Sequence, residues 1–414
     1  MPTHPALVSR AAALDAEHAA ADRSSRFVLP EGLVYLDGNS LGALPVGVAE
    51  RVSEVVTREW GQGLVRSWND AAWWPAAERV GDRIGALVGA ASGQTVVTDS
   101  TTTNIFKVVA AAARMRPGRA RVLVDTDSFP TDLYVVSSAA DLVGLTVERV
   151  HPANAATRVR ELGDDVALTV YSSLDYRTGE LWDLDEITRA VHGVGGLSCW
   201  DLCHSAGVLD LHLDDAGADF AIGCGYKYLN GGPGAPSFVY VRREHLEQFH
   251  NPLAGWNGHA RPFGMEPDYV PSPTISRART GTSPMISLLA LEAALAAYDG
   301  VEVAALRARS LSLTAFFVEC LGGLGVDLPL ATPMDGDRRG SQVSLRHPAA
   351  YGVVQALIAR GVIGDFREPD IIRLGFAPLY VSHADALAAA EHLAAVLAGA
   401  EHESPQNTRR ALVT

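Results

Sequence analysis

The sequence has few of the features that mark zinc-binding, secreted or membrane-spanning proteins. It contains only four cysteines, and their spacing matches no zinc signature: Cys199, Cys203, Cys224 and Cys320. We interpret them as buried, reduced thiols and expect no metal site. No apolar run approaches the roughly 20 residues that span a bilayer. The N-terminus lacks a basic region followed by an apolar stretch and a cleavage site. We therefore expect a cytoplasmic protein that binds no membrane.

Positive charge is also scarce. The formal net charge is −14 and no cluster of lysine and arginine is present, which argues against nucleic acid as a partner. Hydrophobic residues make up 48% of the chain and charged residues 20%, as is typical of a soluble globular protein. A chain of 414 residues can bury a large core, and we expect two subdomains.

The middle of the chain alternates between strand and helix patterns. Predicted strands cover 95–98, 121–125, 146–150, 166–172, 197–201, 219–224 and 236–241, with helical stretches between most of them. This order predicts an α/β fold with a mostly parallel sheet between helices. In such sheets ligands bind at the carboxyl ends of the strands.

The pattern changes after Pro284, where two long helices precede a compact set of short strands and helices. We expect a large domain over 46–284 and a small α+β domain over 285–400, with strands at 341–347, 362–366 and 371–376. An N-terminal segment over 1–45 is expected to contribute to the small domain and to the active site. The polar residues 401–414 are expected to form a disordered tail.

One lysine stands in an unusual setting. Lys227 lies between two tyrosines in the glycine-rich segment GCGYKYLNGGPGAP (223–236), which neither a helix nor a sheet interior tolerates well. Lysine amines in such partly desolvated places trap carbonyl groups. We hypothesise that Lys227 forms a Schiff base with pyridoxal phosphate (PLP). A loop lysine beside a tight turn is the alternative.

Three features upstream supply further parts of such a site, each at the end of a predicted strand. The first is a run of hydroxyls at Ser100–Thr103 before a helix, where free N–H groups and the helix dipole favour a phosphate. Serine and threonine are also ordinary N-caps, so the motif alone is weak. The second is FPTD: its phenylalanine can stack on a flat ring and its aspartate can accept a hydrogen bond, although a proline-started helix explains it equally well. Its residues are Phe129, Pro130, Thr131 and Asp132.

The third feature is WDLCH (200–204). Asp201 ends a buried-looking strand, where an unpaired carboxylate is costly, so it needs a partner. A protonated pyridine nitrogen is such a partner, and the pairing makes PLP an electron sink. His204 can orient the aspartate or contact the cofactor. Lys227 follows Asp201 by 26 residues, the ordering expected of PLP enzymes of fold type I.

Together these segments resemble the kynureninase family over nearly the whole chain. The resemblance rests on YLDGNSLG (35–42), FPTDLY (129–134), VYSSLDYRTGEL (170–181), WDLCHSAG (200–207), YKYLNGGPGAP (226–236), LAGWNGH (253–259), RTGTSPM (279–285) and IIRLGFAPLY (371–380). YLDGNSLG with YKYLNGGPG is specific, whereas related aminotransferase-like lyases share only the lysine and the aspartate.

The resemblance implies a role for each matching position. Lys227 would bind PLP covalently, Asp201 would pair with its ring nitrogen, and Phe129 would stack on its ring. Other cofactor contacts would come from Thr101, Thr102, Pro130, Thr131, Asp132, Ser172, His204, Tyr226, Trp256 and Thr282, with Trp256 and Thr282 reaching in from a second subunit. Arg373 would bind the substrate's α-carboxylate, the alternative being a strand arginine paired to Asp365 or Glu368. Asn39, Ser40 and Trp68 would border the aryl end, and Tyr226 would shuttle a proton.

The resemblance also implies a reaction. A homodimer would hydrolyse L-kynurenine to anthranilate and L-alanine, and 3-hydroxykynurenine to 3-hydroxyanthranilate, in tryptophan catabolism or NAD biosynthesis. Family members that favour the hydroxylated substrate carry a histidine in the loop matching WGQGLVRSW (60–68). This loop has none, so we expect a preference for unsubstituted kynurenine.

Three other functions remain to be weighed. A cysteine desulfurase or selenocysteine lyase of the same fold needs a nucleophilic cysteine on a mobile loop of the small domain. The only cysteine there, Cys320, lies in the apolar pattern TAFFVECLGG, which predicts a buried, inert thiol. An aminotransferase fits the surrounding motifs less well. A scaffold without activity is expected to lose the lysine, the aspartate or the arginine, and all three are present.

Overall fold

The computed structural model describes residues 4–410, and these form two units. The large unit comprises Gly47–Asp175 and Trp182–Leu295. The small unit comprises Tyr176–Leu181 together with the described parts of 1–46 and 296–414. The chain therefore crosses between the units several times.

A seven-stranded sheet forms the centre of the large unit. Its strand order is β4 (Thr95–Val97), β10 (Ser237–Val241), β9 (Phe220–Cys224), β8 (Leu197–Asp201), β7 (Val166–Ser172), β5 (Arg121–Val124) and β6 (Thr146–Arg149). β10 is antiparallel to both its neighbours, and the strands from β9 to β6 are parallel. The central strands are apolar and buried on both faces, as a sheet covered by helices requires. The predicted mostly parallel sheet is confirmed.

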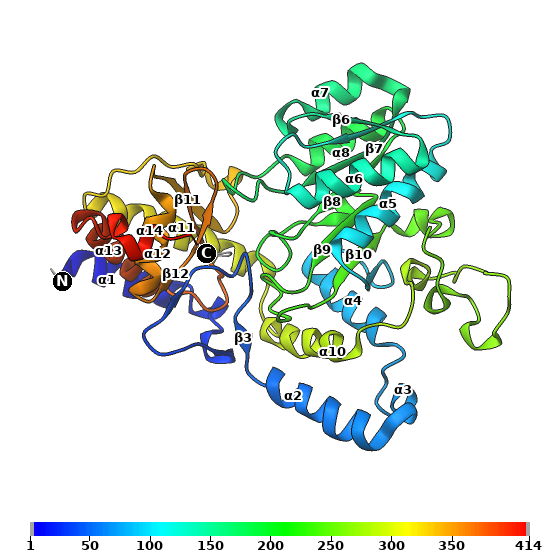
Figure 1. Cartoon of the computed structure of the whole chain (residues 1–414), viewed down its shortest axis with the longest axis horizontal. Coiled ribbons are helices and arrows are strands. Elements are labelled where there is room, and N and C mark those ends of the chain that lie inside the picture. The colour runs from blue at the N-terminus through cyan, green and yellow to red at the C-terminus, as the bar shows by residue number, and fades with distance from the viewer. Residues whose placement is uncertain (1–3, 411–414) are drawn as a thin grey trace. The chain divides into compact units, whose positions relative to one another are not determined.

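Helices cover both faces of this sheet (Figure 1). α5 (Thr101–Met115) and α6 (Pro130–Val143) pack together, and α7 (Pro152–Leu162) packs on α8 (Leu184–Gly193). Right-handed crossovers place these two pairs on opposite faces, because the chain reverses its direction along the sheet after β6. The remaining helices are α2 (Val48–Glu54), a π-helix (Val55–Gly63), α3 (Ser67–Asp70), α4 (Ala76–Leu87), α9 (Leu213–Ala216) and α10 (Met285–Ala294).

The small unit is an α+β structure. β11 (Gln342–Arg346), β14 (Ile371–Gly375) and β13 (Asp365–Arg367) form an antiparallel sheet, β12 (Val362–Ile363) pairs with β2 (Val34–Tyr35), and β1 (Phe27–Val28) pairs with β3 (Leu44–Pro45). The expected strand 362–366 is split at Gly364. A Cβ there would lie 2.4 Å from a Leu374 methyl group, so the close approach requires glycine. The helices are α1 (Pro5–Glu17), α11 (Val303–Gly323), α12 (Ala350–Ala359), α13 (His383–Ala398) and α14 (Pro405–Thr408).

The structure differs from the expected domain organisation in three places. Tyr176–Leu181 belongs to the small unit, although it lies within the range expected for the large domain. Helix α10 belongs to the large unit, because Ala290 and Ala294 pack on Val48 of α2. Residues 401–410 are folded rather than disordered. Arg360 donates to Glu401 at 2.8 Å, and the guanidinium of Arg410 lies 4.5 Å from the ring centroid of Tyr351. These contacts give the polar segment partners that its composition does not reveal.

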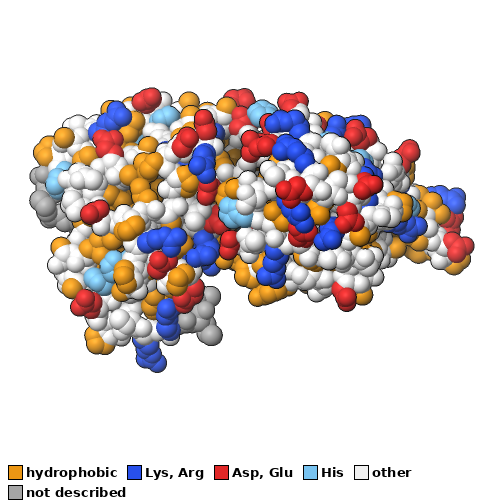
Figure 2. Space-filling model, turned by 90° about the horizontal axis from the view of Figure 1, so that it is seen from above, with side chains coloured by type: hydrophobic (Ala, Val, Ile, Leu, Met, Phe, Trp, Pro, Cys, Tyr) orange, Lys and Arg blue, Asp and Glu red, His pale blue; other side chains and the backbone are white. Residues whose placement is uncertain are grey.

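Two expectations from composition can be compared with the described residues. All four cysteines are buried and free, as interpreted. None of the helices within residues 4–410 combines the length and the hydropathy that crossing a membrane demands. On the face shown in Figure 2, acidic and basic side chains are interspersed.

A buried carboxylate joins three elements of the large unit. Asp219, just before β9, accepts hydrogen bonds from His192 at 2.9 Å, from His245 at 2.7 Å and from the Ser198 amide at 2.8 Å. Burial opposes ionisation of this group. The hydrogen bonds from the two histidines nevertheless hold the pKa of Asp219 well below its ordinary value. The hydrogen bond between His192 and Asp219 also raises the pKa of His192.

We predict a pH-dependent loss of stability from this pair. A raised His192 pKa means that its contribution is complete below the ordinary histidine pKa and is lost as the pH rises through the folded-state pKa. His192 is half-exposed, so we expect the free energy of unfolding to fall by less than about 1 kcal/mol from this pair. Urea unfolding of the wild type and of His192→Gln at pH 6 and pH 9 measures it. A wild-type decrease as small as that of the variant would contradict the prediction.

Candidate active site

The carboxyl ends of three neighbouring parallel strands assemble the predicted residues. Ser172, the last residue of β7, is in register with Asp201, the last residue of β8. β9 ends at Cys224, and the chain then turns through Gly225 and Tyr226 to Lys227. Parallel strands end at the same edge of a sheet, so segments far apart in the sequence meet there.

Lys227 lies half-buried within a polar and aromatic group of side chains. Its Nζ is 2.9 Å from Nε2 of His204, 5.8 Å from the ring centroid of Phe129 and 5.9 Å from that of Tyr226. The following glycines let the loop fold back closely: the Gly231 amide donates to the Gly225 carbonyl at 2.8 Å. A Cβ at Gly225 would lie 2.6 Å from the Pro236 carbonyl oxygen. The glycine-rich segment therefore presents the amine at the edge of the sheet.

Two buried carboxyl groups accompany this amine. Asp201 accepts a hydrogen bond from the Cys203 amide at 2.6 Å, and Asp132 accepts one from the Ser128 hydroxyl at 3.1 Å. Burial, and then the proximity of Asp201, raise the pKa of Asp132 well above its ordinary value. An acidic pair of this kind suits a cationic partner, because one more positive charge allows both carboxylates to ionise.

The start of α5 lies next to the same strand end. Ser100 caps the helix by accepting from the Thr103 amide, and the Thr101 hydroxyl is 3.7 Å from Sγ of Cys203. Thr102 is exposed. First-turn N–H groups and the dipole of a 15-residue helix favour an anion at this position.

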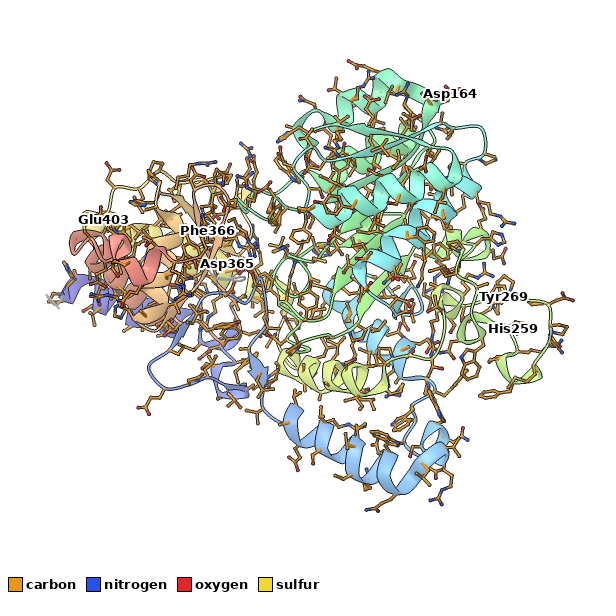
Figure 3. All side chains as sticks on the ribbon, viewed as in Figure 1. Asp164, His259, Tyr269, Asp365, Phe366 and Glu403 are labelled. Atoms are coloured by element: carbon orange, nitrogen blue, oxygen red, sulfur yellow. The ribbon has the colours of Figure 1, made fainter. Side chains whose placement is uncertain are left out.

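Trp256 and Thr282 lie in an irregular excursion between β10 and α10, drawn in yellow-green in Figure 1. Trp256 packs against Trp74 at 5.4 Å and Phe263 at 5.9 Å between ring centroids, and Thr282 is exposed. His259 and Tyr269, labelled in Figure 3, form an edge-to-face pair with centroids 5.7 Å apart that braces the excursion.

Trp68 follows the π-helix and belongs to an aromatic cluster. Its ring lies 5.7 Å from Trp73 and 6.1 Å from Trp74, measured between centroids. Buried Glu59 accepts a hydrogen bond from the Trp73 indole at 2.6 Å and one from Arg51 at 2.6 Å. Sequence reasoning missed Glu59, although an acidic residue beside several tryptophans needs a donor.

In the small unit, Arg373 is paired with Asp365, which is labelled in Figure 3. Nε donates to Oδ1 of Asp365 at 2.7 Å, Nη2 donates to the other carboxylate oxygen and to Ser40 Oγ at 2.8 Å, and Nη1 donates to the Tyr176 carbonyl at 2.8 Å. The pairing that sequence analysis left as an alternative is thus present. It uses the Nε–Nη2 edge and leaves one Nη1 hydrogen outside these bonds.

Asn39 and Ser40 lie beside this arginine. Ser40 donates to Asp365 at 2.7 Å, and buried Asn39 approaches Gly375 so closely that a Cβ there would lie 2.1 Å from its Oδ1. Burial, followed by the charge of Asp365, raises the pKa of nearby Asp37 to about 7. The sequence motif YLDGNSLG indicated that Asn39 and Ser40 belong to the site, but it did not indicate that they contact the strands around Arg373.

Comparisons with known proteins show which sequences and structures this chain is similar to. Residues 306–393 match the family model described as the kynureninase C-terminal domain. A kynureninase from Deinococcus radiodurans is 47% identical, with 93% of this chain and 95% of the relative covered. One from Pseudomonas fluorescens is 44% identical, covering 93% and 94%. Among solved structures, a cysteine desulfurase from Thermococcus onnurineus superposes with a TM-score of 0.76 at 16% identity, covering 91% of this chain and 98% of that one, which shows a shared fold alone.

Proposed function

This chain belongs to the kynureninase family, and from that premise we propose that it hydrolyses L-kynurenine to anthranilate and L-alanine with PLP as its cofactor. The observation that carries the proposal is the amine of Lys227 at a strand edge that also holds a buried carboxyl pair. A lone buried acid pair is costly, and a pyridinium nitrogen relieves that cost. The donor set therefore fits this cofactor.

The residues that would hold PLP are supplied by the strand ends and the start of α5. We propose that Lys227 binds the aldehyde carbon covalently, that Asp201 pairs with the ring nitrogen and that Phe129 stacks on the ring. The start of α5 would receive the phosphate. The further contacts proposed are Thr101, Thr102, Pro130, Thr131, Asp132, Ser172, His204 and Tyr226, with Trp256 and Thr282 from a second subunit. When bound, PLP withdraws electrons from the substrate's α-carbon.

The side chains of this site would then move protons. Lys227 would act as the general base for the proton on the α-carbon, and its contact with His204 at 2.9 Å would orient the amine. Asp201 would hold the proton on the ring nitrogen. Burial, followed by the proximity of Cys224, raises the pKa of Tyr226, so its phenol is protonated at neutral pH and can donate a proton. Water would add to the γ-carbonyl, the Cβ–Cγ bond would break to release the aryl carboxylic acid, and Cβ would take a proton to become the methyl group of alanine.

The residues proposed to bind the substrate are Arg373, Ser40, Asn39 and Trp68. Arg373 would bind the α-carboxylate through its remaining Nη1 hydrogen and its positive charge, because Asp365 and Ser40 occupy the Nε–Nη2 edge. Ser40 donates to Asp365 and accepts from Arg373, so we assign it to the carboxylate end rather than to the aryl end. Trp68 remains the proposed aryl contact, and Asn39 supports Gly375 close to Arg373 in the chain.

The decisive experiment is product formation from kynurenine by the purified protein. Anthranilate fluorescence should appear together with an equal amount of L-alanine, and cysteine should yield no sulfide. Burial raises the pKa of Cys320 to about 12, so this thiol is no nucleophile for a desulfurase reaction. Alanine and sulfide from cysteine, without anthranilate from kynurenine, would reject the proposal.

We predict a preference for unsubstituted kynurenine. The loop 60–68 contains no histidine to donate to a ring hydroxyl, and the apolar ring of Trp68 is in contact with two other tryptophans. We expect kcat/KM for kynurenine to exceed that for 3-hydroxykynurenine by about tenfold, a difference of roughly 1.4 kcal/mol. Steady-state assays with both substrates measure the ratio, and a tenfold preference for the hydroxylated one would overturn it.

We further propose that the protein acts as a cytoplasmic homodimer in tryptophan catabolism or NAD biosynthesis, without a nucleic-acid partner. Large apolar side chains are exposed near the aromatic cluster, as a subunit interface requires: Trp60, Leu64, Val65, Trp256, Phe263 and Met265. Sedimentation at micromolar concentration should give twice the mass of 43.9 kDa.

A further inference from the structure

The chain contains only two lysines, and the second, Lys107, is fully buried on α5. Its ammonium has three hydrogens and three acceptors. It is ion-paired with Asp99, and it donates to Asn104 Oδ1 at 3.1 Å and to the Ala278 carbonyl at 2.8 Å. This ammonium, with all its hydrogens donated, joins residues 99–107 to Ala278, which lies 171 residues further along the chain.

Its partner Asp99 stands directly before the N-cap of α5. It adopts a left-handed backbone conformation with φ of 52°, which is uncommon for a residue with a side chain. Oδ1 of Asp99 accepts the Thr280 hydroxyl at 2.7 Å, while Oδ2 accepts the Thr98 hydroxyl at 2.7 Å and pairs with Lys107. The start of α5 is thereby tied to the segment Ala278–Thr280.

That segment also anchors the turn that carries Trp256. The Asn257 amide donates to the Thr280 carbonyl at 3.2 Å, and Nδ2 of Asn257 donates to the Gly281 carbonyl at 2.6 Å. A Cβ at Gly255 would lie 2.2 Å from the Thr280 oxygen, so only glycine permits this approach. The ion pair therefore links the start of α5 to both loops proposed to reach the partner subunit.

The charge of Asp99 is the reason an ion pair is needed there. A carboxylate two residues before Thr101 would repel an anion bound at the first turn of α5. Lys107 supplies the opposite charge from the interior of the large unit, where solvent does not screen it. The ion pair thus lets Asp99 hold the loop before α5 in place, while Lys107 cancels the negative charge that would repel a phosphate.

We propose that Lys107 is a positioning residue for the cofactor's phosphate: it neutralises Asp99 and ties the start of α5 to Ala278–Thr280. This rests on the proposed function, because it assumes that PLP binds with its phosphate at α5. Lys107 takes no part in the chemistry. Its effect should depend on the phosphate group and on the charge of Asp99.

The test compares two ligands on the same apoenzyme. Dissociation constants for PLP and for pyridoxal, which lacks the phosphate, are measured by absorbance titration of the wild type and of Lys107→Met. We expect the PLP constant to rise by about 10- to 50-fold and the pyridoxal constant by less than about threefold. In the double variant with Asp99→Asn, PLP affinity should return to within about fivefold of wild type, because no charge remains.

Arg309→Met is the matched control. Arg309 is a buried cation of the small unit, 3.3 Å from Asp22, and its loss should leave the ratio of the two constants unchanged. An equal loss of affinity for PLP and for pyridoxal in Lys107→Met, or no recovery of PLP affinity with Asp99→Asn, would overturn the proposal.

If Lys107→Met does not fold, Thr280→Val keeps the charges and removes only the hydrogen bond between Thr280 and Asp99. It should weaken PLP about two- to fivefold relative to pyridoxal, and no change in that ratio would also overturn the proposal. A wild type that binds no PLP would instead reject the proposed function.

Discussion

Lys227→Ala is expected to lower kcat for kynurenine hydrolysis by at least about 10³-fold, because it removes the proposed general base and the proposed covalent anchor of the cofactor. Lys227 is the amine at the strand edge, 2.9 Å from His204 and facing the rings of Phe129 and Tyr226. The other lysine, Lys107, is a buried residue of α5 whose ammonium is held by three acceptors, so it cannot replace Lys227. The fold should survive, since Lys227 is only half-buried.

The presence of only two lysines makes the attachment point easy to identify. Borohydride reduction of the holoenzyme followed by peptide mass spectrometry should place the cofactor's mass on the peptide that contains Lys227 and leave the Lys107 peptide unchanged. The visible absorbance of the bound cofactor should change in Lys227→Ala. His204→Gln is the comparison, because it keeps the amine and removes its neighbour. Modification at Lys107, or full activity in Lys227→Ala, would contradict the assignment.

Arg373→Met is expected to be damaging in two separate ways. It leaves Asp365 buried without its bidentate partner, and breaking a buried ion pair costs about 3–5 kcal/mol of unfolding free energy. It also removes the proposed carboxylate-binding group, which should lower kcat/KM for kynurenine by about 10²- to 10³-fold, mainly through KM. The double variant Arg373→Met with Asp365→Asn should recover stability but not activity.

Whether the loss of stability and the loss of kcat/KM can be separated decides the role of Arg373. Arg367 also pairs with Asp365 but is more exposed, so Arg367→Met serves as the matched control with a smaller loss of stability. Urea unfolding and steady-state kinetics on the wild type and these three variants give the comparison. If Arg373→Met loses stability while the double variant regains both stability and KM, the arginine is only the structural partner of Asp365, and the proposed carboxylate site is wrong.

The fold was accessible from the sequence because its elements are locally encoded. Alternation of apolar runs and helical patterns predicted the seven strands of the large sheet, whose central strands are apolar on both faces. The tail at 401–410 was missed because its polar composition suggests disorder. Its order comes from Arg360 and Tyr351, which lie far from it in the chain.

For the site, the sequence by itself determined the chemistry of the individual groups. Lys227, Asp201 and Asp132 were recognisable because glycine, strand ends and acidic residues create local patterns. Only the tertiary structure decided what each group touches. It placed Ser40 on Arg373, paired that arginine with Asp365, and tied Asp99 to Lys107 and Thr280. Ser40 lies 333 residues from Arg373 in the chain, and Asp99 lies 181 residues from Thr280. Hydrogen bonds act only over a few ångströms, so the folded chain alone brings these partners within reach.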